Sequence, residues 1–241
     1  MPLGLQAAAR RFVDERGLVW GRFRRHSCWS SGHGAQRGRQ LKRIIVGITG
    51  ASGTQIGVRA IEALVDAGVE AHVVISRWGL QTLAHETDLS LDDLRARATI
   101  VYPTGDMGAA ISSGSFVVDG MLVAPCSMRS LAAISTGLGD NLIHRAADVT
   151  LKERRKLVLV PRETPLSEIH LDHMLRLSRM GAVVMPPNPA FYNRPVGLTE
   201  IVDQFVSRLL DQVGVESHLG QRWQGTKSIS GKVLRLDPAD G

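Results

Sequence analysis

The stretch Ile44-Ile45-Val46-Gly47-Ile48-Thr49-Gly50-Ala51-Ser52-Gly53 decides the fold. Its first half is a short apolar run rich in β-branched residues, which is typical of a strand buried on both faces. The glycines at its end interrupt the run. The residues that follow have helical spacing, with Gly68 as the stop signal and an apolar face made of Ile56, Ala60, Ala63, Leu64 and Ala67. A second apolar run at 71–76 completes a βαβ unit.

The rest of the chain continues this alternation. Further buried strands are expected at 121–124, 157–160 and 182–185, and helices at 128–137, 140–154, 166–180 and 199–213. The pattern predicts an α/β fold with a doubly wound, mostly parallel sheet.

The positive charge is confined to one end of the chain. The formal net charge is +6 and the pI is about 9.9. Residues 1–43 hold ten Lys and Arg against Asp14 and Glu15, so the other 198 residues are slightly acidic. This placement argues against a nucleic-acid partner, because the basic charge lies outside the predicted sheet.

We predict three segments: a basic, disordered leader at 1–41, one domain at 42–225 and a loose tail at 226–241. The leader is either an organelle transit peptide or the product of a mis-assigned start. No apolar run is long enough to span a membrane, and Cys28 and Cys126 are too few for a disulfide framework. We therefore expect a cytoplasmic protein, or a mitochondrial one if the leader is a transit peptide.

Candidate site residues follow the predicted strands. Ligands of open parallel sheets bind beyond the carboxyl ends of the strands, so these residues should converge at one edge. They are the turn 50–53, Ser76, the segment 125–130, the segment 161–164 and the loop 186–195.

Several of these motifs also have simple structural explanations. The turn 50–53 is neither a dinucleotide fingerprint nor a P-loop, so a tight strand-to-helix turn explains it as well as a phosphate site does. Ser52 and Thr54 are expected to cap the next helix in either case. Arg145 and Lys152 lie two turns apart on one helix face, where both could meet an anion, although cations near a helix end are usually solvated.

Glu163 lies between two prolines after a buried strand and is a candidate general acid or base if the site excludes water. An exposed pair with Arg162 is the alternative. Tyr192 and Trp223 are loop or tail anchors on their own, but their rings could stabilise an allylic cation. His170 and His173 are expected to be solvated helix histidines, because no metal motif accompanies them.

Taken together, the motifs resemble the flavin prenyltransferases related to UbiX and Pad1. The resemblance covers about residues 42–225 and rests on Gly47-Ile-Thr-Gly-Ala-Ser-Gly53, Ser76, His85-Glu-Thr-Asp88, Ser112-Ser-Gly-Ser115, Pro125-Cys-Ser-Met-Arg-Ser130, the segment 145–155, Pro161-Arg-Glu-Thr-Pro165, Phe191-Tyr192 and Arg222-Trp223.

The resemblance implies a Rossmann-like or flavodoxin-like flavoprotein that forms a homododecamer, binds FMN at subunit contacts and uses no metal. By it, FMN would be bound by Gly50, Ala51, Ser52, Ser76, Ser127, Met128, Arg129, Ser130 and Arg162. Dimethylallyl phosphate would be bound by Arg145, Lys152, Tyr192 and Arg208. The catalytic group would comprise Ser52, Glu86, Lys152, Glu163 and Trp223.

The implied reaction joins a dimethylallyl group to N5 and C6 of reduced FMN. Lys152 and Arg208 would stabilise the leaving phosphate while aromatic faces shelter the allyl cation. Glu163, assisted by Ser52, would remove the C6 proton. The prenylated FMN would then pass to a UbiD-type decarboxylase.

Two alternatives stay open from the sequence. One is an FMN-dependent cysteine decarboxylase, which is expected to have a catalytic histidine and a Pro-x-Met-Asn segment where this chain has Pro186-Pro-Asn-Pro189. The other is a noncatalytic flavin carrier or decarboxylase subunit.

Overall fold

The computed structural model describes residues 41–223 and residue 225. The predicted domain, apart from residue 224, falls within this part of the chain, whereas the predicted leader, apart from Leu41, and the predicted tail lie outside the described residues.

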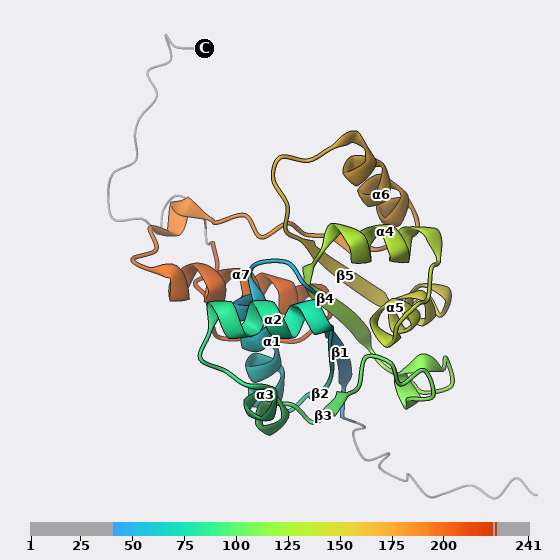
Figure 1. The fold of residues 1–241 in the computed structure, drawn as a ribbon. Coiled ribbons are helices and arrows are strands. Elements are labelled where there is room, and N and C mark those ends of the chain that lie inside the picture. Colours follow the sequence, from blue (N-terminus) through green and yellow to red (C-terminus); the bar gives the residue numbers. More distant parts are fainter. Residues whose placement is uncertain (1–40, 224, 226–241) are drawn as a thin grey trace, which may run out of the picture. The chain divides into compact units, whose positions relative to one another are not determined.

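The described residues form one parallel sheet of six strands in the order β3-β2-β1-β4-β5-β6 (Figure 1). The strands are β1 Arg43–Ile48, β2 Glu70–Ile75, β3 Ile100–Tyr102, β4 Gly120–Cys126, β5 Lys156–Pro161 and β6 Val183–Val184. This order is that of the doubly wound Rossmann fold, so the predicted fold class is confirmed. The short edge strand β3 was missed, and the last strand is shorter than the predicted 182–185.

Helices cover both faces of the sheet. They are α1 Thr54–Asp66, α2 Arg77–Glu86, α3 Leu91–Arg97, α4 Met128–Thr136, α5 Leu142–Lys152, α6 Glu168–Arg179 and α7 Leu198–Gln212, with short 3-10 turns η1 Ala110–Ser112 and η2 Phe191–Asn193.

The alternation of side chains along β1 divides the core into two layers. Ile44, Val46 and Ile48 belong to the cluster that includes α1 and α7, whereas Ile45 belongs to the cluster that includes α4, α5 and α6. All four side chains are at most 1% exposed, as expected for a strand covered on both faces.

One predicted buried position and one predicted helix end were wrong. Ala67 is not on the buried face of α1 but is its exposed C-cap, because Gly68 follows in the left-handed conformation at φ 71°. Helix α5 stops at Lys152 rather than continuing to residue 154, since Arg154 has φ 55° and Arg155 bonds to the carbonyls of Gly114 and Phe116. None of the helices in the described part of the chain is long and apolar enough to cross a lipid bilayer.

Candidate functional site

One group of predicted site residues lies where β1 and β4 are neighbours in the sheet. The chain leaves these strands toward opposite sides of the sheet, which opens a crevice beyond their carboxyl ends. Thr49 joins the two ends: its Oγ donates to the carbonyl of Pro125 at 2.9 Å and accepts from the N–H of Ser127 at 2.7 Å. The N–H of Arg162 donates to the Cys126 carbonyl at 3.3 Å, so the turns after β1, β4 and β5 are tied together.

The turn after β1 is held by a carboxylate from α2. Glu86 accepts hydrogen bonds from the N–H of Gly53 at 2.9 Å, from the N–H of Thr54 at 2.8 Å and from Thr54 Oγ at 2.7 Å. Gly53 itself is the N-cap, at φ 100°, and offers no side chain. The expectation that Ser52 and Thr54 cap α1 was therefore wrong, because Glu86 supplies the acceptor.

Glu86 is ionised in this position. Burial raises the pKa of Glu86, but hydrogen bonds from Ser52, Thr54 and the Gly53 N–H together bring it below its ordinary value. The structure thus places Glu86 at the start of α1, where a negative charge also interacts favourably with the helix dipole.

Two further helices begin at the same edge. Ser76 caps α2 by accepting from the N–H of Gly79 at 3.0 Å, and Ser127 caps α4 by accepting from the N–H of Ser130 at 3.3 Å. Gly50 packs against α2, since a Cβ there would lie 2.3 Å from Trp78 Cβ. The edge therefore combines helix N-termini with hydroxyls, an arrangement that suits a phosphate-bearing ligand.

A cavity of about 450 Å³ opens beside this edge. Its polar wall includes Ser52, Glu86 and Arg162, and its apolar wall is provided mainly by α7 and the loop after β6. The lining residues are Ser52, Gly53, Gln55, Ile56, Glu86, Arg162, Pro187, Asn188, Pro189, Leu198, Ile201, Val202 and Phe205. Its volume is in the range of sites for small organic ligands.

The remaining predicted residues at this edge lie in the connecting segments. Ala51 and Met128 are half-buried, whereas Arg129 is exposed and pairs with Asp140 at 3.5 Å. Glu163 follows Arg162 and is also exposed, with its Oε1 accepting from the N–H of Thr164 at 3.1 Å.

A second group of predicted residues lies on a different side of α7. Tyr192, Arg208 and Trp223 line a cavity of about 310 Å³, and the rings of Tyr192 and Trp223 are perpendicular with centroids 5.2 Å apart. At 100° per residue, the α7 positions lining this cavity lie about a third of a turn from those lining the first cavity. The expected aromatic pair and its neighbouring cation are thus present together.

Lys152 lies apart from both groups. Lys152 lines a hollow with Lys156, which begins β5, whereas Arg162 follows the end of that strand. Six residues at 3.3 Å each separate these two ends by about 20 Å. Within the chain, Arg145 pairs with Asp148 at 2.8 Å and Lys152 pairs with Glu153. A single copy therefore does not bring Lys152 to the Arg162 edge.

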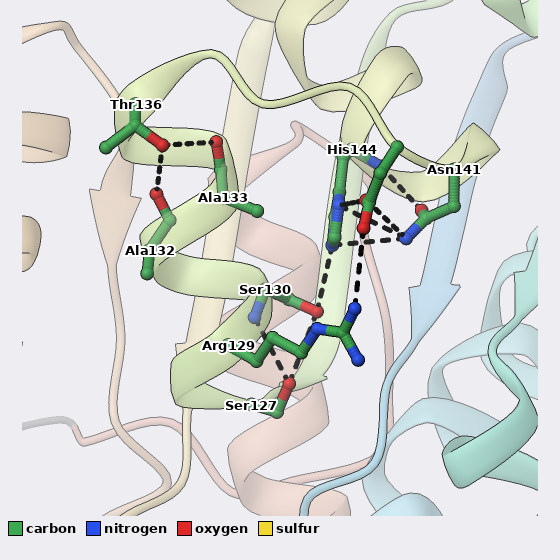
Figure 2. Close-up of polar contacts among 9 residues, drawn as sticks. Ser127, Arg129, Ser130, Ala132, Ala133, Thr136, Asn141 and His144 are labelled. Carbon is green, nitrogen blue, oxygen red and sulfur yellow. Dashed lines mark hydrogen bonds and ion pairs between the residues drawn. The ribbon is translucent and has the colours of Figure 1, made fainter.

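Sequence reasoning missed two polar residues next to the site, Asp140 and His144. His144 is 3% exposed, contacts the Asp140 carboxylate through Nδ1 and lies 3.1 Å from Ser130 Oγ through Nε2 (Figure 2). The available signal was Asn141, a good N-cap three residues before His144. His173 is also not simply solvated, because its Nδ1 lies 2.6 Å from the buried Ser135 Oγ.

The residues at the β1 and β4 edge fit FMN. Helix N-termini, the Ser52 and Ser76 hydroxyls and the Arg162 cation suit its phosphate, and an apolar cavity wall suits its ring system. Among residues 41–223 and 225, no cluster of three or more His, Cys, Asp or Glu could hold a metal ion.

Comparison with known proteins agrees with this geometry. The Flavoprotein family model matches residues 34–211. A probable UbiX-like flavin prenyltransferase of Bacillus subtilis is 53% identical over 196 residues, which are 81% of this chain and 96% of the relative. The chain belongs to the flavin prenyltransferase family.

Solved structures of flavin prenyltransferase relatives share the fold. The crystal structure of AnUbiX (PadA1) with FMN and dimethylallyl pyrophosphate has a TM-score of 0.76 and 49% identity, covering 77% of this chain and 99% of that one. A dodecameric FMN-dependent UbiX-like decarboxylase from Escherichia coli O157:H7 has a TM-score of 0.74 and 53% identity, covering 76% and 100%.

Proposed function

We propose that this flavin prenyltransferase joins the dimethylallyl group of dimethylallyl phosphate to N5 and C6 of reduced FMN. The observation that carries the proposal is the convergence of helix N-termini, Ser52 and Arg162 beside an apolar cavity at the crevice between β1 and β4. The family membership supplies the reaction type.

The flavin would lie at the edge formed by the turns after β1, β2, β4 and β5. Gly50, Ala51, Ser52, Ser76, the segment 127–130 and Arg162 would bind it there. When bound, reduced FMN supplies the two nucleophilic atoms, N5 and C6, that accept the five-carbon group.

The donor phosphate would be bound by cations, because phosphate leaves as the allylic C–O bond breaks. Arg208 lines the same cavity as the Tyr192 and Trp223 rings, which would stabilise the allyl cation. Lys152 would come from a neighbouring copy, since in its own chain it lies beside the amino end of β5, about 20 Å from the end that Arg162 follows. Arg145, seven residues earlier on α5, would be the other donor cation. This requirement supports a homo-oligomer, which we propose to be a dodecamer like the E. coli relative.

Glu163 would act as the base at the C6 proton, with Ser52 as its hydroxyl partner. In one chain Glu163 is exposed, so a neighbouring copy must exclude water from it if it is to act as a base. Glu86 would act mainly by holding the Ser52 turn, because its oxygens are occupied by donors at the start of α1.

The product, prenylated FMN, would be passed to a UbiD-type decarboxylase in the cytoplasm, or in mitochondria if the leader is a transit peptide. A partner of this type can be tested by adding the purified product complex to an apo-decarboxylase and measuring release of carbon dioxide.

Anaerobic incubation of the full chain with reduced FMN and dimethylallyl phosphate tests the activity. Mass spectrometry is expected to show a flavin that has gained one C5H8 unit, with phosphate released in equal amount. Unchanged flavin that stays bound would instead support a carrier and would refute the transferase. Parallel reactions with the diphosphate would establish which donor is used.

A further inference from the structure

A continuous hydrogen-bond chain connects the start of α4 with the buried histidine of α5 (Figure 2). Ser127 Oγ donates to Ser130 Oγ at 3.2 Å, and Ser130 Oγ lies 3.1 Å from His144 Nε2. His144 Nδ1 contacts the carboxylate of Asp140. Ser130 and His144 are 6% and 3% exposed, whereas Ser127 is half-buried at the edge where the flavin is proposed to bind.

The partners of His144 determine where its proton lies. An ionised carboxylate only accepts hydrogen bonds, so Nδ1 carries the hydrogen and the neutral ring leaves Nε2 as an acceptor. Asn141 Nδ2 and Arg129 also contact Asp140, which orients the carboxylate. Burial lowers the pKa of His144, partly offset by the Asp140 contact, so the ring is neutral at neutral pH.

With His144 neutral, both hydroxyls in this hydrogen-bond chain donate in the same direction, toward His144. Ser130 donates to Nε2, and Ser127 donates to Ser130. The hydrogen of Ser127 is thereby used inside the protein, so Ser127 offers a ligand only lone pairs.

Protonation of His144 reverses this direction. Nε2 then carries a hydrogen and must donate to Ser130 Oγ, so the Ser130 hydroxyl turns toward Ser127. The Ser127 hydroxyl hydrogen then no longer bonds to Ser130 Oγ and points away from the hydrogen-bond chain. Ser127 thus changes from a hydrogen-bond acceptor for a ligand into a donor.

We propose that Asp140 and His144 are positioning residues that hold Ser127 as a hydrogen-bond acceptor for an N–H group of the bound flavin. This inference rests on the proposed function, because it takes the flavin to bind at this edge. Ser130 is too buried to act as a nucleophile, although the Ser130, His144 and Asp140 contacts follow the order of a hydrolase triad.

The test measures FMN affinity between pH 5 and pH 8 from the change in flavin fluorescence, with no prenyl donor present. In the wild-type protein the affinity is expected to fall about tenfold as the pH falls through the pKa of His144, because a donor then faces a donor. His144→Gln keeps an acceptor for Ser130 but does not titrate, so its affinity should stay within about twofold of the wild-type value at pH 8 and lack this step.

Asp140→Ala supplies a second, opposite prediction. Removal of the Asp140 carboxylate leaves Asn141 Nδ2, which lies 3.1 Å from His144 Nδ1, as the group that faces this nitrogen. Since that amide donates, Nδ1 becomes the acceptor and Nε2 carries the hydrogen, so FMN should bind about tenfold more weakly already at pH 8.

His173→Gln is the matched control, because His173 contacts the buried Ser135 near the other end of α4. This variant should show the same pH dependence of FMN affinity as the wild type. The FMN phosphate titrates equally with all four proteins, so its titration does not account for a difference between them. If the fall in FMN affinity at low pH seen in the wild type persists in His144→Gln, the proposed positioning role of Asp140 and His144 is refuted, even if Asp140→Ala fails to fold. Loss of FMN binding by the wild-type protein would refute the proposed flavin site itself.

Discussion

Replacing Glu86 tests whether a carboxylate from α2 holds the turn that carries Ser52. Three hydrogen bonds run to Glu86 from Gly53 N–H, Thr54 N–H and Thr54 Oγ, at 2.7–2.9 Å. Loss of a helix cap costs about 0.5–2 kcal/mol, and loss of a negative charge at a helix N-terminus costs about 0.3–1 kcal/mol. We therefore expect Glu86→Ala to lower the free energy of unfolding by about 2 kcal/mol.

Glu86→Gln removes the negative charge but keeps a side-chain hydrogen-bond acceptor of the same length. The amide oxygen can still accept from the Thr54 N–H, so the expected loss is about 1 kcal/mol. With a urea m-value of about 2 kcal/mol per M, the Ala and Gln variants should unfold about 1 M and 0.5 M earlier than the wild type. The protein concentration must be the same throughout, because assembly adds to apparent stability.

The pH dependence gives an independent check. The pKa of Glu86 is lower in the folded protein than its ordinary value of 4.5, so the ionised group stabilises the fold above that value. This contribution is lost as the pH falls through the folded pKa. The difference between wild type and Glu86→Gln should therefore be present at pH 7 and shrink as the pH falls below the ordinary value of 4.5 and through the lower folded pKa.

Glu168 provides the control for this experiment. It lies in the first turn of α6, where Ser167 supplies the cap, so Glu168→Ala should cost at most about 0.5 kcal/mol. The reasoning would be refuted if Glu86→Ala shifted the urea midpoint no more than Glu168→Ala does.

Three further changes test other parts of the structure. Lys152→Ala and Glu163→Gln chains are expected to be inactive alone but to recover about a quarter of wild-type activity when co-assembled in equal amounts. The reason is that separate copies would supply the two groups, so about one site in four would receive both intact side chains. No recovery would contradict a shared site. Glu163→Gln alone should bind FMN within about twofold of wild type but give none of the four-ring product by mass spectrometry, and wild-type yields would exclude it as the base. Burial raises the pKa of Cys126 to about 12. In a Cys28→Ser variant, a thiol reagent at pH 7 should therefore label the native protein at least about 100-fold more slowly than the urea-unfolded protein. Comparable labelling rates would show that Cys126 is accessible.

The elements that the sequence predicted well are those with strong local signals. The apolar run of β1, the glycine turn and the periodic face of α1 agree with one another, and the same holds for α7. Helix α2 was not predicted because it buries only Gly79 and Leu83, and β3 was missed because it is a short edge strand whose first residue is exposed.

The contacts that the sequence did not predict join residues far apart in the chain. Glu86 caps α1 from 32 residues away, so the local rule that favours Ser52 or Thr54 selected the wrong acceptor. His144 and Ser130 meet only because α4 and α5 pack together. Such pairings depend on the path of the chain between two helices, which propensity and periodicity do not report.

The division of the predicted cations between the two ends of β5 has a consequence for assembly. The turn that carries Arg162 lies beyond the carboxyl end of this strand, and Lys152 lies beside its amino end. No side-chain motion covers about 20 Å, because an extended lysine reaches only about 6 Å from its Cα. If Lys152 acts on a donor that lies against the flavin bound by Arg162, the two cations must belong to different copies. An isolated chain could then still bind flavin through its own turns while lacking half of the donor site, so oligomerisation would be a requirement of the transfer step rather than of flavin binding.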